Sequence, residues 1–192
     1  MLKLPDLPVR PWLATDEASL VRHADSYQVW RSVRDRFPRP YTHDDARKWI
    51  GSQLEASEPF LNFAIELEGE AVGGIGLIPG FDVESRTAEL GYWLGEAAWG
   101  RGLATAAVRS ILPYAFERLE LLRVFAAVFD FNPASARVVE KAGFVREGVL
   151  RDAAVKEGRV TSMVVYGMTR GDYQRAQEVG VTPNDLKLRT KP

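Results

Sequence analysis

Residues 99–107, WGRGLATAA, combine residue types that suit the binding of a phosphate group. Gly100 and Gly102 flank Arg101, and a run of helix-forming residues follows. Glycine lets the backbone bend toward a ligand without a Cβ clash. The free N–H groups at a helix start lie at the positive end of its dipole, where anions bind. The pattern therefore fits either a cradle for a phosphorylated ligand, with Arg101 adding a positive charge, or a structural turn before a capped helix.

Two common nucleotide motifs do not fit this stretch. A P-loop requires a Gly-Lys pair, and none occurs in the chain. A dinucleotide fingerprint requires a third glycine where Thr105 stands, and it opens the first strand-helix unit of its fold rather than lying mid-chain. So short a glycine-rich motif more often marks a turn with a purely structural role than a binding site.

A second candidate pair is Asn132 and Ser135, in the segment NPASARVVEKAGF at residues 132–144. Asn132 is expected to cap a helix whose first residue is Pro133. Ser135 then lies in the first helical turn. Both residue types are common at these places, so capping alone accounts for them on the residues themselves.

Hydrophobic periodicity predicts the elements that position these residues. Helices are expected at residues 15–24, 25–37, 42–54, 101–119 and 132–144. Strands are expected at 61–79 (two strands around a turn at 68–70), 86–95, 121–130, 144–155 and 160–169. This order predicts an α/β fold with helices on a mixed sheet.

Several local details follow from the same patterns. Thr15 and Thr42 are expected to cap their helices, and Pro113 is expected to kink the helix that contains it. The helix at 42–54 should bury one face, formed by Ala46, Trp49, Ile50 and Leu54.

Composition limits the possible functions. The chain has 192 residues, of which 46% are hydrophobic, and this size and composition predict one domain. Its formal net charge of -1 gives no electrostatic reason to expect binding to nucleic acid or to an anionic membrane. It has no cysteine, which excludes thiolate catalysis and disulfides. The two histidines, His23 and His43, do not form a metal motif, so no metal is expected. The N-terminus does not resemble a signal peptide, and no apolar run reaches the ~20 residues of a membrane span. We therefore expect a cytoplasmic protein.

The loop at 99–107 resembles motif A of the GNAT acetyltransferases, Q/R-x-x-G-x-G/A. It matches at Gly102 and Ala104, and it departs at Trp99, where the motif has Gln or Arg. A W-G-x-G loop is typical of the RimJ/RimL-like N-acetyltransferases. The chain also resembles that branch, in the right order, in the segments RPW at 10–12, FPRPYT at 37–42, AELGYWL at 88–94, NPASARVVEKAGF at 132–144 and EGVLRD at 147–152. The resemblance covers about residues 9–170.

This resemblance implies a GNAT fold, with about seven mostly antiparallel strands flanked by helices on both faces. It implies one domain at residues 1–172 and a polar tail at 173–192. It also implies acetyl-CoA as cosubstrate, held between two strands that splay apart, at 89–94 and 123–129. The residues implied to bind it are Tyr92, Trp93, Leu94, Gly100, Arg101, Gly102, Leu103, Ala104, Thr105, Asn132, Ser135 and Lys141.

The resemblance also implies catalytic roles. A strand N–H would stabilise the oxyanion, and Ser135 would protonate the leaving thiolate. The glutamate that RimL-like enzymes carry after EGxL is replaced here by Ala154. Glu89 is then the best remaining carboxylate for a general base, although a solvated charge at a strand end explains it equally well. Tyr92 is a further candidate, but an aromatic residue in a strand is usually part of the core.

The implied reaction is acetyl transfer to a primary amine, with a protein N-terminal α-amine as the leading acceptor. A small amine, a peptide or an antibiotic is an alternative acceptor. A non-catalytic acyl-CoA-binding module and another type of nucleotide-binding protein also stay open, and a homodimer is possible. The acceptor pocket is expected beside FPRPYT. Trp30, Arg34, Phe37 and Tyr41 either line it or pack in the core.

Overall fold

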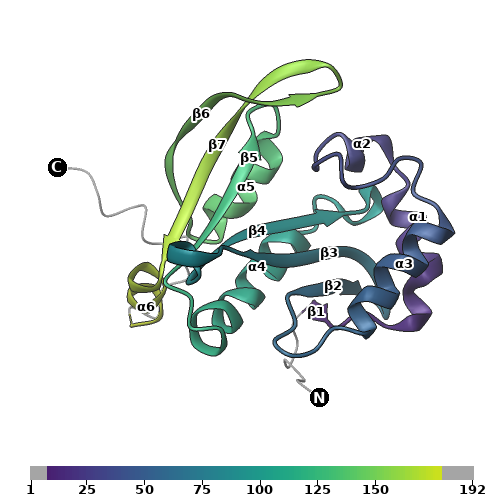
Figure 1. Cartoon of the computed structure of the whole chain (residues 1–192), viewed down its shortest axis with the longest axis horizontal. Coiled ribbons are helices and arrows are strands. Elements are labelled where there is room, and N and C mark those ends of the chain that lie inside the picture. The colour runs from purple at the N-terminus through teal and green to yellow at the C-terminus, as the bar shows by residue number, and fades with distance from the viewer. Residues whose placement is uncertain (1–7, 179–192) are drawn as a thin grey trace. The chain divides into compact units, whose positions relative to one another are not determined.

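The computed structural model describes residues 8–178 and contains a seven-stranded sheet in the order β1-β2-β3-β4-β5-β7-β6 (Figure 1). β4 and β5 pair in parallel, whereas β1–β2, β2–β3, β5–β7 and β6–β7 pair antiparallel. The mixed, mostly antiparallel sheet with helices confirms the predicted fold class. The strands are β1 Val9–Arg10, β2 Asn62–Leu67, β3 Glu70–Pro79, β4 Thr87–Leu94, β5 Arg123–Phe129, β6 Val145–Lys156 and β7 Arg159–Thr169.

The helices and strands follow one another in much the predicted order. They are α1 Glu17–Ala24, α2 Tyr27–Trp30, α3 His43–Leu54, α4 Leu103–Pro113, α5 Pro133–Lys141 and α6 Arg170–Glu178. Short 3₁₀ turns lie at Ala14–Asp16 (η1), Asp82–Glu84 (η2) and Glu96–Ala98 (η3). Helix α4 ends at Pro113, and a π-helical turn, η4 (Tyr114–Arg118), continues the segment. The kink expected at Pro113 stays a prediction. Within residues 8–178, no helix has the length and apolar character needed to span a membrane.

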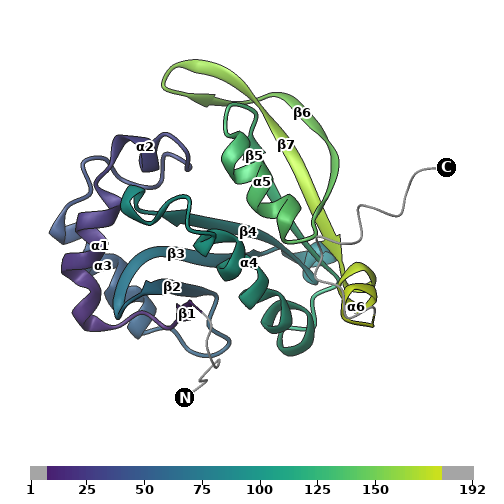
Figure 2. The same ribbon diagram turned by 180° about the vertical axis from the view of Figure 1, so that it is seen from behind.

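The described chain divides into two compact units, and strands β3 and β4 each pass from one to the other. Of the described residues, unit 1 contains 8–76 and 91–110, and unit 2 contains 77–90 and 111–178. In unit 1, the buried core joins α1, α3 and β2, with Leu20, Ala46 and Ala64 each at most 1% exposed. Figures 1 and 2 show α1 and α3 side by side in this unit.

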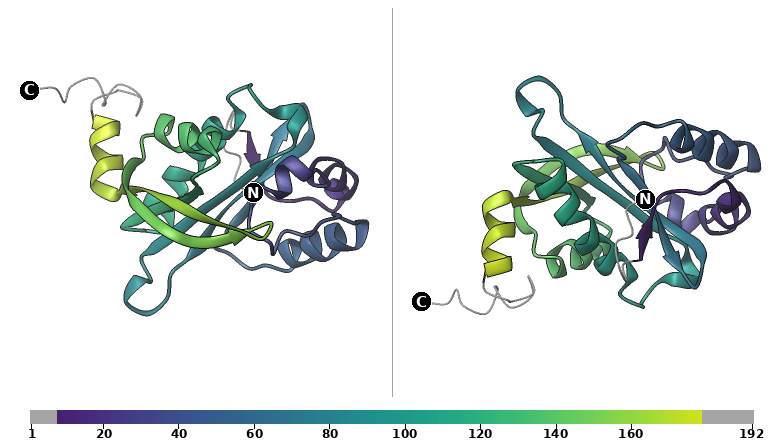
Figure 3. Two further views of the ribbon diagram at one scale, coloured as in Figure 1. Left: turned by 90° about the horizontal axis from the view of Figure 1, so that it is seen from above. Right: turned by 90° about the horizontal axis from the view of Figure 1, so that it is seen from below.

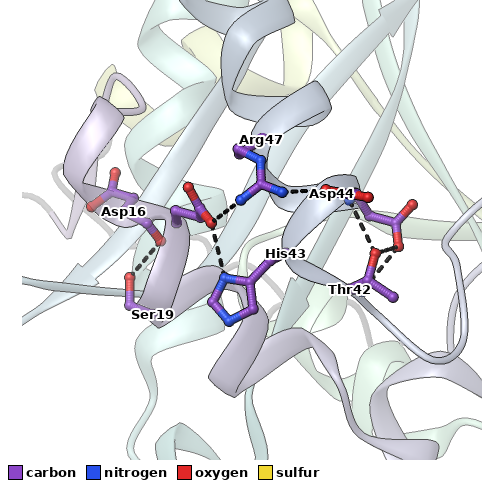
Figure 4. Close-up of polar contacts among 8 residues, drawn as sticks. Asp16, Ser19, Thr42, His43, Asp44 and Arg47 are labelled. Atoms are coloured by element: carbon purple, nitrogen blue, oxygen red, sulfur yellow. Dashed lines mark hydrogen bonds and ion pairs between the residues drawn. The ribbon is translucent and has the colours of Figure 1, made fainter.

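The start of α3 is fixed by Thr42, as predicted. The Thr42 hydroxyl accepts the N–H of Asp45, and the Asp45 carboxylate accepts the N–H of Thr42 in return. Hydrogen bonds from Thr42 hold the pKa of Asp45 below its usual value. At the same helix end, Arg47 bonds to Glu17 of α1 at 3.1 Å, and His43 contacts the same carboxylate at 2.9 Å (Figure 4). These exposed pairs tie α3 to α1.

Three local predictions in unit 1 were wrong. Thr15 is part of η1, and Asp16 takes the N-cap position of α1. The helix expected over residues 25–37 is confined to Tyr27–Trp30, where the Ser32 hydroxyl bonds to the carbonyl of Gln28 and competes with the helix. In α3, Ala46 and Ile50 are buried, but Trp49 and Leu54 are 37% and 54% exposed. The apolar face of α3 is therefore narrower than its sequence pattern suggests.

Unit 2 is built around strands β5, β7 and β6. Strands β6 and β7 form a long, twisted hairpin (Figures 1 and 3). Arg123 of β5 pairs with Glu147 of β6, and the pair lies directly over Gly167 of β7, where a Cβ would meet both side chains. The guanidinium of Arg123 lowers the pKa of Glu147. The ion pair therefore bridges three neighbouring strands.

Helix α6 extends the ordered part of unit 2 past residue 172, where the polar tail was expected to begin. Tyr173 is buried, and its ring stacks on Phe116 at 5.0 Å between centroids. Its hydroxyl also donates a hydrogen bond to Glu117, and burial together with this contact raises the pKa of Tyr173 to about 12. These contacts explain why a polar stretch forms a helix here. The rest of the expected tail, residues 179–192, lies outside the described residues.

Candidate functional site

The predicted cradle forms a turn between β4 and α4, in unit 1. Gly100 and Gly102 have φ angles of +72° and +77°, in the left-handed region that favours glycine. A Cβ at either position would meet nothing within 4 Å. The glycines are therefore required by the backbone conformation and not by neighbouring atoms, and the space above both of them is open.

The start of α4 supplies the hydrogen-bond donors of this turn. The N–H of Ala106 donates to the carbonyl of Gly102 at 3.0 Å, which closes the first turn of the helix. The N–H groups of residues 103–105 precede that bond and have no intrahelical acceptor. Arg101 is half exposed and lies 3.8 Å from Glu68, a separation that gives only a weak ion pair at an exposed position. Donors, open space and a positive side chain together fit a bound pyrophosphate.

Two hydrogen bonds to strands and one close contact with helix α1 hold this turn in place. The indole N–H of Trp99 donates to the carbonyl of Leu94 at 2.8 Å, and the N–H of Gly95 donates to Val72 of β3 at 2.9 Å. The ring of His23 lies against Gly95, where a Cβ would come within 2.5 Å of Nδ1. Trp99, which departs from the expected motif, therefore has a structural role at the loop.

Sequence reasoning missed part of this support. The hydroxyl of Ser26, just before α2, donates to Glu96 of η3, and His23 contacts Glu70 at 3.2 Å. Both contacts join residues more than 45 positions apart, so no local pattern could have revealed them. Gly95 was the one signal in the sequence that a side chain, here His23, lies close against the backbone.

The strand expected to bind the cosubstrate belongs to both units. Tyr92 and Trp93 are half-buried in unit 1, and Leu94 is buried there. Glu89 is half-buried in unit 2, where it pairs with Phe125 of β5. The β4–β5 pairs in unit 2 end at Glu89, and β4 continues into unit 1 from Gly91. The splaying of the two strands stays a prediction.

The aromatic residues expected near an acceptor are mostly packed in unit 1. The ring of Phe37 lies 5.0 Å from Tyr41 and 5.4 Å, edge-on, from Trp93. Burial, followed by the charge of Asp45, raises the pKa of Tyr41 to about 12. Tyr41 is therefore protonated at neutral pH and unsuited to act as a base. Trp30 is half-buried, whereas Arg34 is exposed.

Unit 2 brings two of the predicted residues together and separates a third. Asn132 caps α5, because its side-chain oxygen accepts the N–H of Ser135 at 3.1 Å. The cap uses the oxygen of Asn132 and not its amide hydrogens. Lys141 is exposed at the other end of α5, about 9 Å along the helix axis from Ser135. Ala154 lies on β6, opposite Thr161.

The site has no sign of a metal centre. Among residues 8–178, no three histidine, aspartate or glutamate side chains are grouped closely enough to hold a metal ion.

Comparison with known proteins gives a consistent result. Residues 6–145 match the acetyltransferase (GNAT) domain. The SPbeta prophage-derived uncharacterized N-acetyltransferase YokL of Bacillus subtilis is 33% identical over 140 residues, which cover 72% of this chain and 76% of YokL. The putative ribosomal N-acetyltransferase YdaF of the same organism is 36% identical over 56% of this chain and 58% of YdaF.

A solved structure agrees with these sequence matches. Mycobacterium smegmatis RimJ in complex with CoA-disulfide is 25% identical to this chain, with a TM-score of 0.71 over 91% of each chain. The family match covers most of the chain, and the turn between β4 and α4 fits the pyrophosphate of coenzyme A. The chain therefore belongs to the GNAT acetyltransferase family, as an N-acetyltransferase that uses acetyl-CoA as its cosubstrate.

Proposed function

We propose that the enzyme acetylates the α-amino group at the N-terminus of a polypeptide, as a member of the RimJ/RimL-like branch. The observation that carries the proposal is the small number of bases on β4, where Glu89 is the one carboxylate of the strand and is half-buried. Neutralising an α-amine of pKa ~8 at pH 7 costs about 1.4 kcal/mol, against about 4.6 kcal/mol for a lysine of pKa ~10.4. A site with few bases can therefore deprotonate an α-amine far more easily than a lysine side chain.

The comparisons support this choice of acceptor. YdaF, which is named a putative ribosomal N-acetyltransferase, shares 36% identity with the chain over the matched part. The ribosomal-protein-serine acetyltransferase of Escherichia coli shares 33% identity over half of its length. An acceptor of this type is made in the cytoplasm, and the proposal places the enzyme there.

In the proposed mechanism, bound acetyl-CoA supplies the acetyl group as an activated thioester. The N–H groups at residues 100–105 hold the pyrophosphate, with Arg101 adding a charge. Backbone groups of Tyr92, Trp93 and Leu94 align the pantetheine arm. One strand N–H stabilises the negative charge that develops on the carbonyl oxygen during attack.

The proton transfers are assigned to residues of unit 2. Glu89 accepts the proton that the acceptor amine loses, directly or through a water molecule. The hydroxyl of Ser135 donates a proton to the departing thiolate, or orients the water that does so. Asn132 fixes the first turn of α5 through its oxygen and offers its amide hydrogens to the cosubstrate. Tyr92 is the alternative proton acceptor, and Lys141 stays a predicted cosubstrate contact at the far end of α5.

The acceptor is tested by thiol release from acetyl-CoA over a panel of amines. The panel contains peptides that begin with Ser, Ala or Thr, the same peptides blocked at the N-terminus but carrying an internal lysine, polyamines and aminoglycosides. The proposal expects turnover of the free peptides and little turnover of the blocked ones. Turnover confined to polyamines or aminoglycosides would instead assign a small-molecule acceptor.

The alternative of a non-catalytic acyl-CoA-binding module is dropped, because the chain is a GNAT N-acetyltransferase. A homodimer stays a prediction, and light scattering of the purified protein at several concentrations would determine it.

A further inference from the structure

A cluster of cationic and aromatic side chains lies at α2 and in the segment that follows it, in unit 1. The guanidinium carbon of Arg39 lies 4.8 Å from the ring centroid of Tyr27 and 5.4 Å from that of Trp30. The guanidinium carbon of Arg31 lies 5.6 Å from the Tyr27 centroid. Stacking on an aromatic face restrains the orientation of a guanidinium group. Tyr27 itself is 39% exposed, so the cluster is at the surface.

Positive charge is concentrated in this part of the chain. Residues 31–39 contain four arginines and one aspartate, although the whole chain has a formal net charge of -1. Arg34, Arg36 and Arg39 are all exposed. We call residues 31–39 the arginine segment. A near-neutral protein that gathers four arginines within nine residues presents a local positive field to its surroundings.

The arginine segment is packed against the strand that is expected to hold the cosubstrate. Phe37, near the end of the segment, contacts Trp93 of β4 edge-on, with 5.4 Å between ring centroids. Phe37 and Trp93 both pack on the buried core of unit 1. Arg36 and Arg39 lie one and two residues from this anchored ring, so their positions relative to β4 are constrained.

We propose that the arginine segment binds acidic side chains of the polypeptide acceptor, a few residues beyond the amine that is acetylated. The inference rests on the proposed function, because it requires a polypeptide acceptor. Planar guanidinium groups pair with carboxylates in a two-pronged geometry. A polyamine would be repelled by the same field, so the segment selects against cationic acceptors as well as for acidic ones.

Two peptides with the same first residues test the proposal. One carries Asp and Glu at positions four to eight, and the other carries Gln and Asn there. The wild-type enzyme is expected to favour the acidic peptide by about 10-fold in kcat/KM, mainly through KM. Raising the salt concentration to about 0.5 M should reduce that preference, because exposed charges are screened.

The double variant Arg36→Gln/Arg39→Gln should lose most of the preference while kcat stays close to wild type. A double variant Arg22→Gln/Arg47→Gln is the matched control. It removes two exposed arginines of α1 and α3 in the same unit, with the same change in net charge. The control should keep the preference. Circular dichroism of all three proteins checks that they are folded.

The outcomes separate this inference from the proposed function. Equal use of both peptides by the wild type, or an unchanged preference in Arg36→Gln/Arg39→Gln, overturns the role of the arginine segment and leaves N-terminal acetylation intact. No turnover of either peptide, with turnover of spermidine, overturns the proposed function itself. Binding of single-stranded RNA that the Arg36→Gln/Arg39→Gln variant abolishes, without any peptide preference, would assign the segment to nucleic acid and overturn the inference.

Discussion

Phe37 and Trp93 contact each other edge to face, with 5.4 Å between their ring centroids. The contact joins the segment after α2 to the strand β4, more than fifty residues later in the chain. Because Phe37 also packs on Tyr41, it anchors the arginine segment to the core of unit 1. The Phe37 ring therefore holds this segment together with the stacking of Arg39 on Tyr27 and Trp30.

Replacing Phe37 should weaken the fold measurably. Phe37→Ala is expected to lower the free energy of unfolding by about 2 kcal/mol, below the 3–5 kcal/mol of a fully buried phenylalanine because Phe37 is only partly buried. Phe81→Ala is the matched control, since Phe81 is 84% exposed, and it should stay within about 0.5 kcal/mol of wild type. Urea denaturation followed by circular dichroism measures both. Equal stability of the two variants would show that the Phe37 ring does not anchor the segment.

Asn132 is expected to have two separable roles. Asn132→Asp and Asn132→Ser both keep a side-chain oxygen that can cap α5, so their Tm should stay near that of wild type. Both lack the amide hydrogens, so the Kd for acetyl-CoA should rise about fivefold, as expected for one lost hydrogen bond. Isothermal titration calorimetry measures this Kd. Wild-type affinity in Asn132→Ser would reduce Asn132 to a helix cap.

Glu89 is the proposed general base, and its replacement tests the proton transfer. Glu89→Gln should lower kcat by about 100-fold, at the low end of the usual contribution of a general base. The residual activity should rise with pH up to about 8, as the α-amine loses its own proton. Glu84→Gln, an exposed carboxylate of η2 in the same unit, is the control and should keep full activity. A kcat for Glu89→Gln within threefold of wild type would exclude Glu89 as the base.

The ion pair between Arg123 and Glu147 makes the stability of unit 2 depend on pH. The pKa of Glu147 is lowered in the folded state by the guanidinium of Arg123, so the stabilisation is complete above the usual glutamate pKa of ~4.3 and is lost as the pH falls through the folded value. Glu147→Gln should therefore be less stable than wild type at pH 7, by less than about 1 kcal/mol, because both side chains are partly exposed.

Urea denaturation of wild type and Glu147→Gln at pH 7, 5 and 4 tests this dependence. The difference in unfolding free energy should shrink between pH 5 and pH 4. A difference that grows as the pH falls would contradict the assigned direction of the pKa shift.

Elements controlled by short-range chemistry could be predicted from the sequence. The caps at Thr42 and Asn132 follow from side chains that bond to backbone three residues away. The turn at Gly100 and Gly102 follows from the conformational freedom of glycine. The order of strands and helices follows from hydrophobic periodicity, which is also a local pattern. The fold class could therefore be predicted as well.

Features that depend on distant contacts could not be predicted. Trp49 fits the apolar face of α3 by its spacing, but it is 37% exposed, since spacing does not tell where a helix meets its neighbour. The contact of His23 with Gly95, which supports the turn between β4 and α4, joins residues that lie far apart in the chain. Helix α6 continues past residue 172, where a polar tail was expected, because Tyr173 stacks on Phe116. None of these contacts leaves a local pattern.

The central claim is that the turn between β4 and α4 holds the pyrophosphate of acetyl-CoA, and two glycine variants test it directly. Gly102 and Gly158 have φ angles of +77° and +73°, and a Cβ at either would meet nothing within 4 Å, so glutamate strains the backbone alike at both. The measurement is the Kd for acetyl-CoA of Gly102→Glu and Gly158→Glu by isothermal titration calorimetry. Gly102→Glu should bind at least about 100-fold more weakly than wild type, because it sets a negative charge against the phosphates, while Gly158→Glu should bind within about twofold. Equal affinity in the two variants would contradict the assignment of this turn as the cosubstrate site.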